Sequence, residues 1–240
     1  MNQPVKTPRV LLKLSGEQFA GNREYGVDPA FIDNLANELA ETISDTGAQI
    51  AIIVGGGNIM RGASVSKSGI ERASGDYMGM LATIINGIAL VDILEKNGVP
   101  SRLQTRLRCD AVAEPYIRRK AIRNLEKGRL VVVAGGTGNP YVTTDTAAVS
   151  TALELDCDMV LKATKVEGVF DKDPKVHADA KKHDLLTFDK VLTDPQMNVM
   201  DNAAISLAMD NSLPIVVFDL LTKGNIKRVI NGEAVGTKVS

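Results

Sequence analysis

The chain has 240 residues, of which 44% are hydrophobic and 24% are charged. This composition is typical of a globular protein, and the length fits one large domain. The formal net charge is −1 and the pI is about 6.2, which argues against a nucleic-acid-binding surface spread over the whole molecule. The two cysteines, Cys109 and Cys157, lack metal-ligand spacing, so we expect free thiols in a reducing compartment.

The first eight residues contain no apolar core of a signal peptide. No uninterrupted apolar run approaches the roughly 20 residues that span a bilayer. We therefore expect a cytoplasmic protein that binds neither membrane nor nucleic acid.

Short apolar runs rich in β-branched residues alternate with helical patterns. Strands are predicted at Val10–Leu12, Ile50–Val54, Leu130–Val133, Met159–Leu161 and Ile215–Phe218, and more weakly at Val99–Leu103. A helix is predicted from Phe31 to Ile43, with Asp28 as its N-cap and Gly47 as its end. A second helix, Met78 to Leu94, is apolar on most sides, which places it inside the domain or in a subunit interface.

Apolar strands separated by helices predict an α/β fold with a mostly parallel central sheet, covered by helices on both faces. In such sheets the ligand crevice lies outside the carboxyl ends of the strands. We expect residues 1–240 to form a single domain, with a polar surface excursion near residues 171–184.

Loops of small and polar residues follow three of these strands. The first strand ends in Lys13-Leu14-Ser15-Gly16, and the second in Gly55-Gly56-Gly57-Asn58 with Arg61 nearby. The strand at Leu130 leads into Gly135-Gly136-Thr137-Gly138-Asn139-Pro140-Tyr141-Val142-Thr143-Thr144-Asp145. Glycines let backbone N–H groups approach an anion, and a helix N-terminus favours negative charge. The spacing matches neither a Walker A motif nor a Rossmann fingerprint.

Charged residues accompany these loops. Lys162 and Lys165 flank Thr164 at the end of a strand, Phe170 could cover a base, and Asp76, Asp145 and Asp201 stand at the loop mouths. An N-cap or first-turn role is an equally open interpretation of Asp145 and Asp201. The only two histidines lie in the polar excursion, so histidine acid–base chemistry is not expected. Lysines, an arginine and glycine N–H groups suit phosphoryl transfer, which depends on positioning and charge neutralisation.

Together these segments resemble the bacterial type of uridylate (UMP) kinase, in the amino-acid kinase superfamily, over essentially the whole chain. Two of them are specific to this branch, namely Gly75-Asp76-Tyr77-Met78-Gly79-Met80-Leu81-Ala82-Thr83 and the loop from Gly135 to Asp145. The lysine–glycine and triple-glycine signals indicate only the superfamily. Further matching segments are Leu11 to Glu17, Arg61-Gly62, Leu161 to Phe170 and Val199-Met200-Asp201.

The resemblance implies a three-layer α/β/α sandwich that transfers the γ-phosphoryl of MgATP to UMP, giving UDP and ADP in pyrimidine nucleotide biosynthesis. It also implies a homohexamer activated by GTP and inhibited by UTP. Catalytic roles would fall to Lys13, Asp145 and Asp201, with either Lys162 or Lys165 as second lysine. ATP would contact Lys13, Leu14, Ser15, Gly16, Gly57, Arg61, Thr164, Phe170 and Asp173. UMP would contact Gly56, Asp76, Thr137, Gly138, Asn139, Pro140, Tyr141, Val142, Thr143 and Thr144.

The resemblance assigns Mg²⁺ to the nucleotide and names no protein metal ligand. It links GTP activation to the loop Gly21, Asn22, Arg23, Glu24, Tyr25 and Gly26. Val142 departs from the pattern, because relatives usually carry a second aromatic residue there. Two alternatives are a superfamily kinase acting on a carboxylate or carbamate, and a non-catalytic nucleotide-binding or storage protein. The donors between Asn139 and Thr144 argue against the first, and the set Lys13, Arg61, Asp145 and Asp201 against the second.

Overall fold

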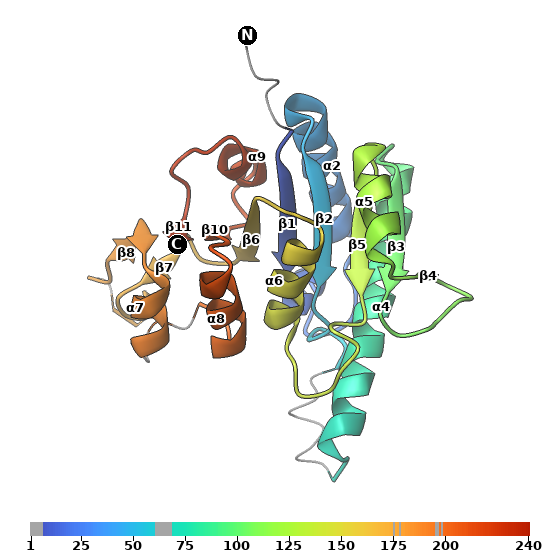
Figure 1. The fold of residues 1–240 in the computed structure, drawn as a ribbon, viewed down its shortest axis with the longest axis horizontal. Coiled ribbons are helices and arrows are strands. Elements are labelled where there is room, and N and C mark those ends of the chain that lie inside the picture. Colours follow the sequence, from blue (N-terminus) through green and yellow to red (C-terminus); the bar gives the residue numbers. More distant parts are fainter. Residues whose placement is uncertain (1–6, 61–68, 175, 178, 195–196, 198) are drawn as a thin grey trace.

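The computed structural model describes residues 7–60, 69–174, 176–177, 179–194, 197 and 199–240. A nine-stranded sheet with the strand order β4-β3-β5-β2-β1-β6-β10-β11-β9 runs through them (Figure 1). Its strands are β1 (Arg9–Leu14), β2 (Gln49–Val54), β3 (Ser101–Thr105), β4 (Glu114–Pro115), β5 (Leu130–Ala134), β6 (Met159–Thr164), β9 (Leu185–Leu186), β10 (Ile215–Asp219) and β11 (Thr237–Val239). A separate two-stranded ribbon pairs β7 (Val169–Phe170) with β8 (Lys182–His183).

Helices cover both faces of the sheet. They are α1 (Gly16–Phe19), α2 (Pro29–Thr46), α4 (Arg72–Lys96), α5 (Arg118–Glu126), α6 (Thr144–Glu154), α7 (Phe188–Thr193), α8 (Asn202–Asp210) and α9 (Asn225–Ile230). In Figure 1, α6 lies in front of β1 and β2, and α2 lies behind them. The predicted α/β class and the three-layer sandwich are confirmed.

The pairing along the sheet is parallel except between β10 and β11. Each predicted strand is present, including the weak one, which forms β3. The sequence did not predict β11, the antiparallel strand inserted between β10 and β9. Its three residues, Thr-Lys-Val, are too short to give a periodic signal.

Side chains along each strand point alternately to the two faces of the sheet, and this divides the hydrophobic core into two layers. In β1, Leu12 and Leu14 join the cluster that contains residues of α2, α4 and α9, whereas Leu11 joins the cluster of α5, α6, α7 and α8. Successive strand side chains point to opposite faces. Strands that are apolar at nearly every position therefore bury both faces, and burial of this apolar surface stabilises the sandwich at roughly 25 cal/mol per Å².

The predicted ends of α2 are confirmed. The Asp28 side chain accepts a hydrogen bond from the Ala30 N–H at 3.1 Å, and Pro29 occupies the first turn. The helix ends at Gly47, whose φ of 64° is in the left-handed region that glycine adopts without strain.

Helix α4 has the length and apolar composition that would suffice to cross a membrane. It nevertheless has the contacts of a core helix, packing against α2, β3 and β5. Its outer side is apolar as well: Tyr77, Leu81, Ile85 and Ile88 are 41–49% exposed. One face of α4 therefore lies in the core, which is one of the two positions predicted for this helix, and the other face is exposed.

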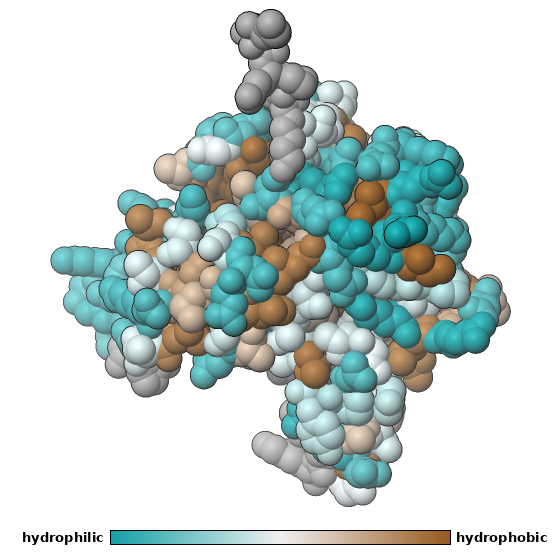
Figure 2. All heavy atoms as spheres, in the orientation of Figure 1, coloured by the Kyte–Doolittle hydropathy of each residue, from teal (hydrophilic) through white to brown (hydrophobic). Residues whose placement is uncertain are grey.

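The N-terminal half of α4 projects beyond the edge of the sheet (Figure 1). At the left of the same view, hydrophilic residues dominate the surface around the β7–β8 ribbon (Figure 2). The polar excursion predicted near residues 171–184 begins directly after β7 and includes β8.

Candidate active site

Two lysines stand opposite each other at the centre of the sheet. Lys13 of β1 pairs in register with Lys162 of β6. Both side chains lie on the α6 face, because they are two residues along their strands from Leu11 and Val160, which pack on that face. Lys13 is only 8% exposed. Two like charges are thus brought together at the carboxyl ends of adjacent parallel strands.

Asp145 joins these two lysines. Its Oδ1 lies 2.7 Å from the Lys13 Nζ, and its Oδ2 accepts a hydrogen bond from the Lys162 Nζ at 2.8 Å. The aspartate lies in the first turn of α6, where the helix dipole also favours negative charge. Lys165, the other predicted candidate for the second lysine, lies beyond the end of β6 and is exposed. The residue beside Asp145 is therefore Lys162.

The charges of this cluster shift the pKa values of Asp145 and Lys162. Burial would raise the pKa of Asp145, but the positive charges of Lys13 and Lys162 outweigh burial and hold that pKa below its usual value. Burial lowers the pKa of Lys162, and Lys13 adds to this effect, although Asp145 opposes it. Asp145 is thus ionised at neutral pH, and Lys162 loses its proton more readily than an exposed lysine.

Asp201 connects the N-terminal ends of α6 and α8. Its side chain caps α8 by accepting from the Ala204 N–H at 2.9 Å. The same carboxylate accepts hydrogen bonds from the hydroxyls of Thr143 and Thr146, the latter at 2.8 Å. Thr143 is in turn the N-cap of α6. The predicted N-cap role of Asp201 is confirmed, and its cross-helix bonds place it next to the Asp145 turn.

Two residues of this cluster have contacts that were not predicted from the sequence. Thr146 follows Asp145 by one residue, and the carbonyl of Val199 accepts a hydrogen bond from the Lys162 Nζ. No periodic or compositional signal marks a backbone carbonyl as a partner of a lysine 37 residues away.

The glycine loops after β1 and β2 interlock. A Cβ atom on Gly16 would overlap the Gly57 nitrogen and lie 2.9 Å from the Gly55 carbonyl carbon. The Gly55 N–H also donates to the Leu14 carbonyl at 2.9 Å. Ser15 begins α1 with a capping box. A Cβ atom on Gly55 would likewise lie 2.7 Å from the Gly16 nitrogen. Larger residues at 16 or 55 would force these loops apart, so both glycines have a steric reason in the contact between loops, whereas the sequence predicted the approach of an anion.

The predicted acceptor loop begins with two consecutive left-handed glycines, Gly135 and Gly136. Thr137 and Asn139 bond within the loop, the Asn139 N–H donating to the Thr137 hydroxyl oxygen at 3.2 Å. The Tyr141 N–H donates to Asp76 Oδ2 at 2.8 Å, which brings Asp76 of α4 to the loop. Val142 is exposed, so its departure from the family pattern removes no core contact.

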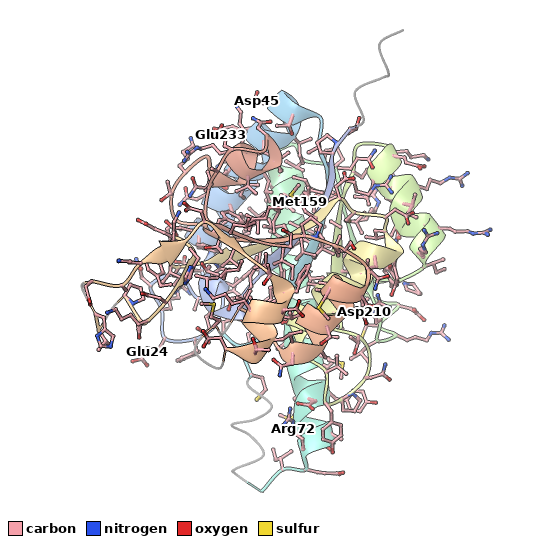
Figure 3. The ribbon with its side chains drawn as sticks, turned by 60° about the vertical axis from the view of Figure 1, so that its left-hand side comes forward. Glu24, Asp45, Arg72, Met159, Asp210 and Glu233 are labelled. Atoms are coloured by element: carbon pink, nitrogen blue, oxygen red, sulfur yellow. The ribbon has the colours of Figure 1, made fainter. Side chains whose placement is uncertain are left out.

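The other described residues that were predicted to bind ATP or GTP lie outside the cluster of Lys13, Asp145 and Lys162. Thr164 ends β6 and its hydroxyl bonds to backbone groups of Val166 and Phe218. Phe170 lies on the β7–β8 ribbon, and Asp173 follows it. The Gly21–Gly26 loop connects α1 to α2, and its exposed Glu24 lies at the lower left in Figure 3. Arg61 lies outside the described residues.

Comparison with known proteins fits this geometry. The sequence profile of the amino acid kinase family matches residues 8–219. The structure is similar to a UMP kinase from Bacillus anthracis, with 39% sequence identity, a TM-score of 0.92, and coverage of 97% of this chain and 95% of that one. A UMP kinase from Ureaplasma parvum gives 32% identity, a TM-score of 0.90, and coverage of 98% and 100%. A uridylate kinase from Archaeoglobus fulgidus gives 27% sequence identity, a TM-score of 0.75, and coverage of 96% of this chain and 99% of that one.

The chain therefore belongs to the amino acid kinase family. The resemblance to the UMP kinase type that was drawn from the sequence is confirmed, since two UMP kinases match at 32% identity or more over almost the whole of both chains.

Proposed function

We propose that the protein is an ATP-dependent nucleoside monophosphate kinase that phosphorylates UMP to UDP. The observation that carries this proposal is the Lys13–Asp145–Lys162 cluster, at the meeting point of three glycine-containing loops. UMP is supported as the acceptor because the chain is 39% identical to a UMP kinase, in an alignment that covers 97% of this chain. Residues 1–240 are proposed to form one domain, because a single sheet draws strands from the chain's beginning to its end.

In the proposed reaction, a phosphate oxygen of UMP attacks the γ-phosphorus of ATP. A new P–O bond forms, the bond between the γ-phosphorus and the β–γ bridging oxygen breaks, and ADP leaves. The UMP phosphate is largely dianionic near neutral pH, since the second pKa of a phosphate ester is about 6. A strong general base is therefore unnecessary, and stabilisation of charge is the main requirement.

Lys13 and Lys162 are proposed to neutralise the negative charge on the transferring phosphoryl group. Asp145 holds both ammonium groups in place, because each of its oxygens faces one of them. Asp201 acts on the same turn of α6 through Thr143 and Thr146. We assign Asp145 and Asp201 to organising charge, as their oxygens already have partners in the protein.

Mg²⁺ would neutralise charge on the ATP phosphates. Among the described residues, His, Cys, Asp and Glu side chains do not gather in groups of three or more that could hold a metal. Mg²⁺ keeps several waters and usually binds through substrate phosphates and one or two carboxylates. Asp145 and Asp201 are the carboxylates nearest the lysines and could reach such an ion through water.

ATP is proposed to lie over Lys13 to Gly16 and Gly57, with its adenosine towards Thr164, Phe170 and Asp173. UMP would bind Gly56, Asp76 and the loop from Thr137 to Thr144. Regulation by GTP through residues 21–26, inhibition by UTP, a hexameric assembly, and a cytoplasmic role in pyrimidine nucleotide synthesis follow from the family resemblance. The exposed apolar stripe of α4 supports association between copies.

The test is the initial rate of ADP formation with MgATP against UMP, CMP, dUMP, N-acetylglutamate, aspartate and carbamate, with and without GTP. We expect turnover with UMP and a rate change on adding GTP. Turnover with a carboxylate or carbamate would show that the acceptor loop has been misinterpreted. A folded protein that turns over none of them would favour a binding or storage role.

A further inference from the structure

Asp76, near the N-terminal end of α4, is held from two sides. The Arg72 Nε donates to both carboxylate oxygens of Asp76, at 2.9 and 3.0 Å. The two residues are one helical turn apart on the same face of α4. From the other side, the Tyr141 N–H donates to Asp76 Oδ2 at 2.8 Å. The carboxylate thus links a helix to the proposed acceptor loop.

Arg72 also reaches the loop directly. Its guanidinium carbon lies 5.7 Å from the centroid of the Tyr141 ring, within the range of cation–π attraction. Arg72 lies at the tip of α4 (Figure 3), on the half of the helix that projects past the sheet. Arg72 therefore contacts both partners of the hydrogen bond between Asp76 and Tyr141.

Tyr141 has a backbone that needs such support. Its φ of 66° is in the left-handed region, which costs a residue with a Cβ of order 1 kcal/mol or more. The side chain is 68% exposed, so burial contributes little to holding it. The contacts with Arg72 and Asp76 are the interactions that tie this strained residue to α4.

The chemistry of Asp76 indicates what these contacts are for. An ionised carboxylate only accepts hydrogen bonds. In UMP the donors are the two ribose hydroxyls and the uracil N–H, so Asp76 would recognise the nucleoside part of the acceptor. Arg72 donates to the same carboxylate and so fixes the direction of its oxygens.

We propose that Arg72 is a positioning residue for UMP, acting by orienting Asp76 and by holding Tyr141 in its left-handed conformation. This inference rests on the proposed function. The pair lies at the surface: the Arg72 side chain is 47% exposed, whereas that of Asp76 is partly buried, at 14%. Exposed pairs contribute little to global stability, so the effect falls on substrate binding.

The test compares Arg72→Ala and Arg72→Lys with the wild type in steady-state kinetics. We expect Arg72→Ala to raise the KM for UMP roughly fivefold to tenfold, from the loss of one exposed ion pair and one cation–π contact. The kcat and the KM for ATP should change less than about twofold. Arg72→Lys keeps the charge without the planar guanidinium and should recover part of the loss.

The matched control is Lys96→Ala. Lys96 pairs with Asp92 on the same helix, at 2.5 Å and with the same i, i+4 spacing, but at the other end. This variant should keep the wild-type KM for UMP. An equal rise in both variants would show a general effect on the helix and overturn the proposal.

Hydrogen exchange gives a second measurement that does not depend on activity. The Tyr141 amide should exchange faster in Arg72→Ala, because its acceptor loses orientation. Unchanged exchange, or an unchanged KM for UMP, would overturn the role of Arg72. A wild-type protein that fails to phosphorylate UMP would instead reject the proposed function, so the two failures are distinguishable.

Discussion

Asn58 and Asn86 exchange two hydrogen bonds through their side-chain amides. The Asn58 Nδ2 donates to Asn86 Oδ1 at 3.0 Å, and the Asn86 Nδ2 donates to Asn58 Oδ1 at 2.7 Å. The remaining donors reach the Gly26 and Gly55 carbonyls, both at 2.7 Å. One amide pair therefore links α4 to the triple-glycine loop and to the Gly21–Gly26 loop.

Replacing Asn86 should destabilise the fold. Asn86 is fully buried, and Asn86→Leu leaves the Gly55 carbonyl and the Asn58 amide without this partner. Buried polar groups left unsatisfied cost about 1–3 kcal/mol each, so for these two groups we expect a loss of about 2–6 kcal/mol in the free energy of unfolding, measured by urea denaturation. Asn37→Leu is the control, since Asn37 bonds the Asp33 carbonyl at an exposed site. Similar losses in both variants would contradict a special role for the pair.

The two candidate lysines should separate in kinetics. Lys162→Met removes the ammonium group 2.8 Å from Asp145, and we expect kcat to fall about 100-fold or more, as for loss of one charge-stabilising donor. Lys165→Met should lower kcat far less, because Lys165 is exposed beyond the strand end. Single-turnover rates with MgATP and UMP measure the difference, and circular dichroism checks the fold. A larger effect at Lys165 would reverse the assignment.

The alkaline limb of the pH–rate profile should report Lys162. Burial lowers the pKa of this ammonium from its usual 10.5, so the proton is lost as the pH rises through the lowered value, and kcat should fall with it. Lys162→Arg keeps its charge at all accessible pH values. Whatever its maximal rate, its profile should decline only at higher pH. The same alkaline limb in wild type and variant would assign the titration to another group.

For Asp145 we expect a change at acid pH, in the stability of the fold. The two lysines hold the pKa of Asp145 below its usual 3.8. The contribution of its carboxylate to stability is therefore complete well above pH 3.8, and it is lost progressively as the pH falls from there through the lowered value. Asp145→Asn should therefore cost stability at pH 7, about 3 kcal/mol as for one broken buried pair. The difference from wild type should shrink in strong acid, and a constant difference from pH 7 to pH 3 would contradict this.

Asp201→Asn should separate capping from the link between helices. Asparagine caps helices about as well as aspartate, so the N-cap of α8 is kept and the thermal midpoint should change little. The amide has one acceptor oxygen in place of two, and one of the bonds from Thr143 and Thr146 is lost. We expect kcat to fall about tenfold, the scale of one charge-assisted hydrogen bond. Loss of stability in proportion to activity would reduce Asp201 to a structural cap.

The apolar stripe of α4 should control association. Leu81→Glu and Ile85→Glu place charges on this exposed face, and we expect the molar mass in solution, measured by light scattering, to fall below that of the wild type. Val176→Glu is the control, because Val176 is exposed in the polar excursion. An unchanged molar mass in the α4 variants would exclude this face as the interface.

Much of the sheet was predictable because its signals are local. Apolar runs predicted the main parallel strands, and the Asp28-Pro29 start and Gly47 end of α2 follow from backbone geometry alone. Strands of two or three residues, such as β4 and β11, carry no periodicity, and their pairing depends on neighbours distant in sequence.

The site was predictable in kind but not in its contacts. Glycine loops and lysines indicated phosphate chemistry, yet the choice between Lys162 and Lys165 depends on strand register with Lys13. The Asp201 bonds to α6 join residues more than 50 positions apart, and the Asn58–Asn86 pair joins residues 28 apart. Sequence patterns report such contacts only after the fold has brought the elements together.

The interlocked glycines at residues 16 and 57 also bear on the entropy of binding. With their backbones in mutual contact, the loops after β1 and β2 cannot open independently. If ATP phosphates bind at these loops as proposed, they would meet N–H groups whose directions are already fixed, and little of the binding free energy would be lost in ordering the chain. The same contact makes the two loops a single mechanical unit, and a displacement of one carries the other with it.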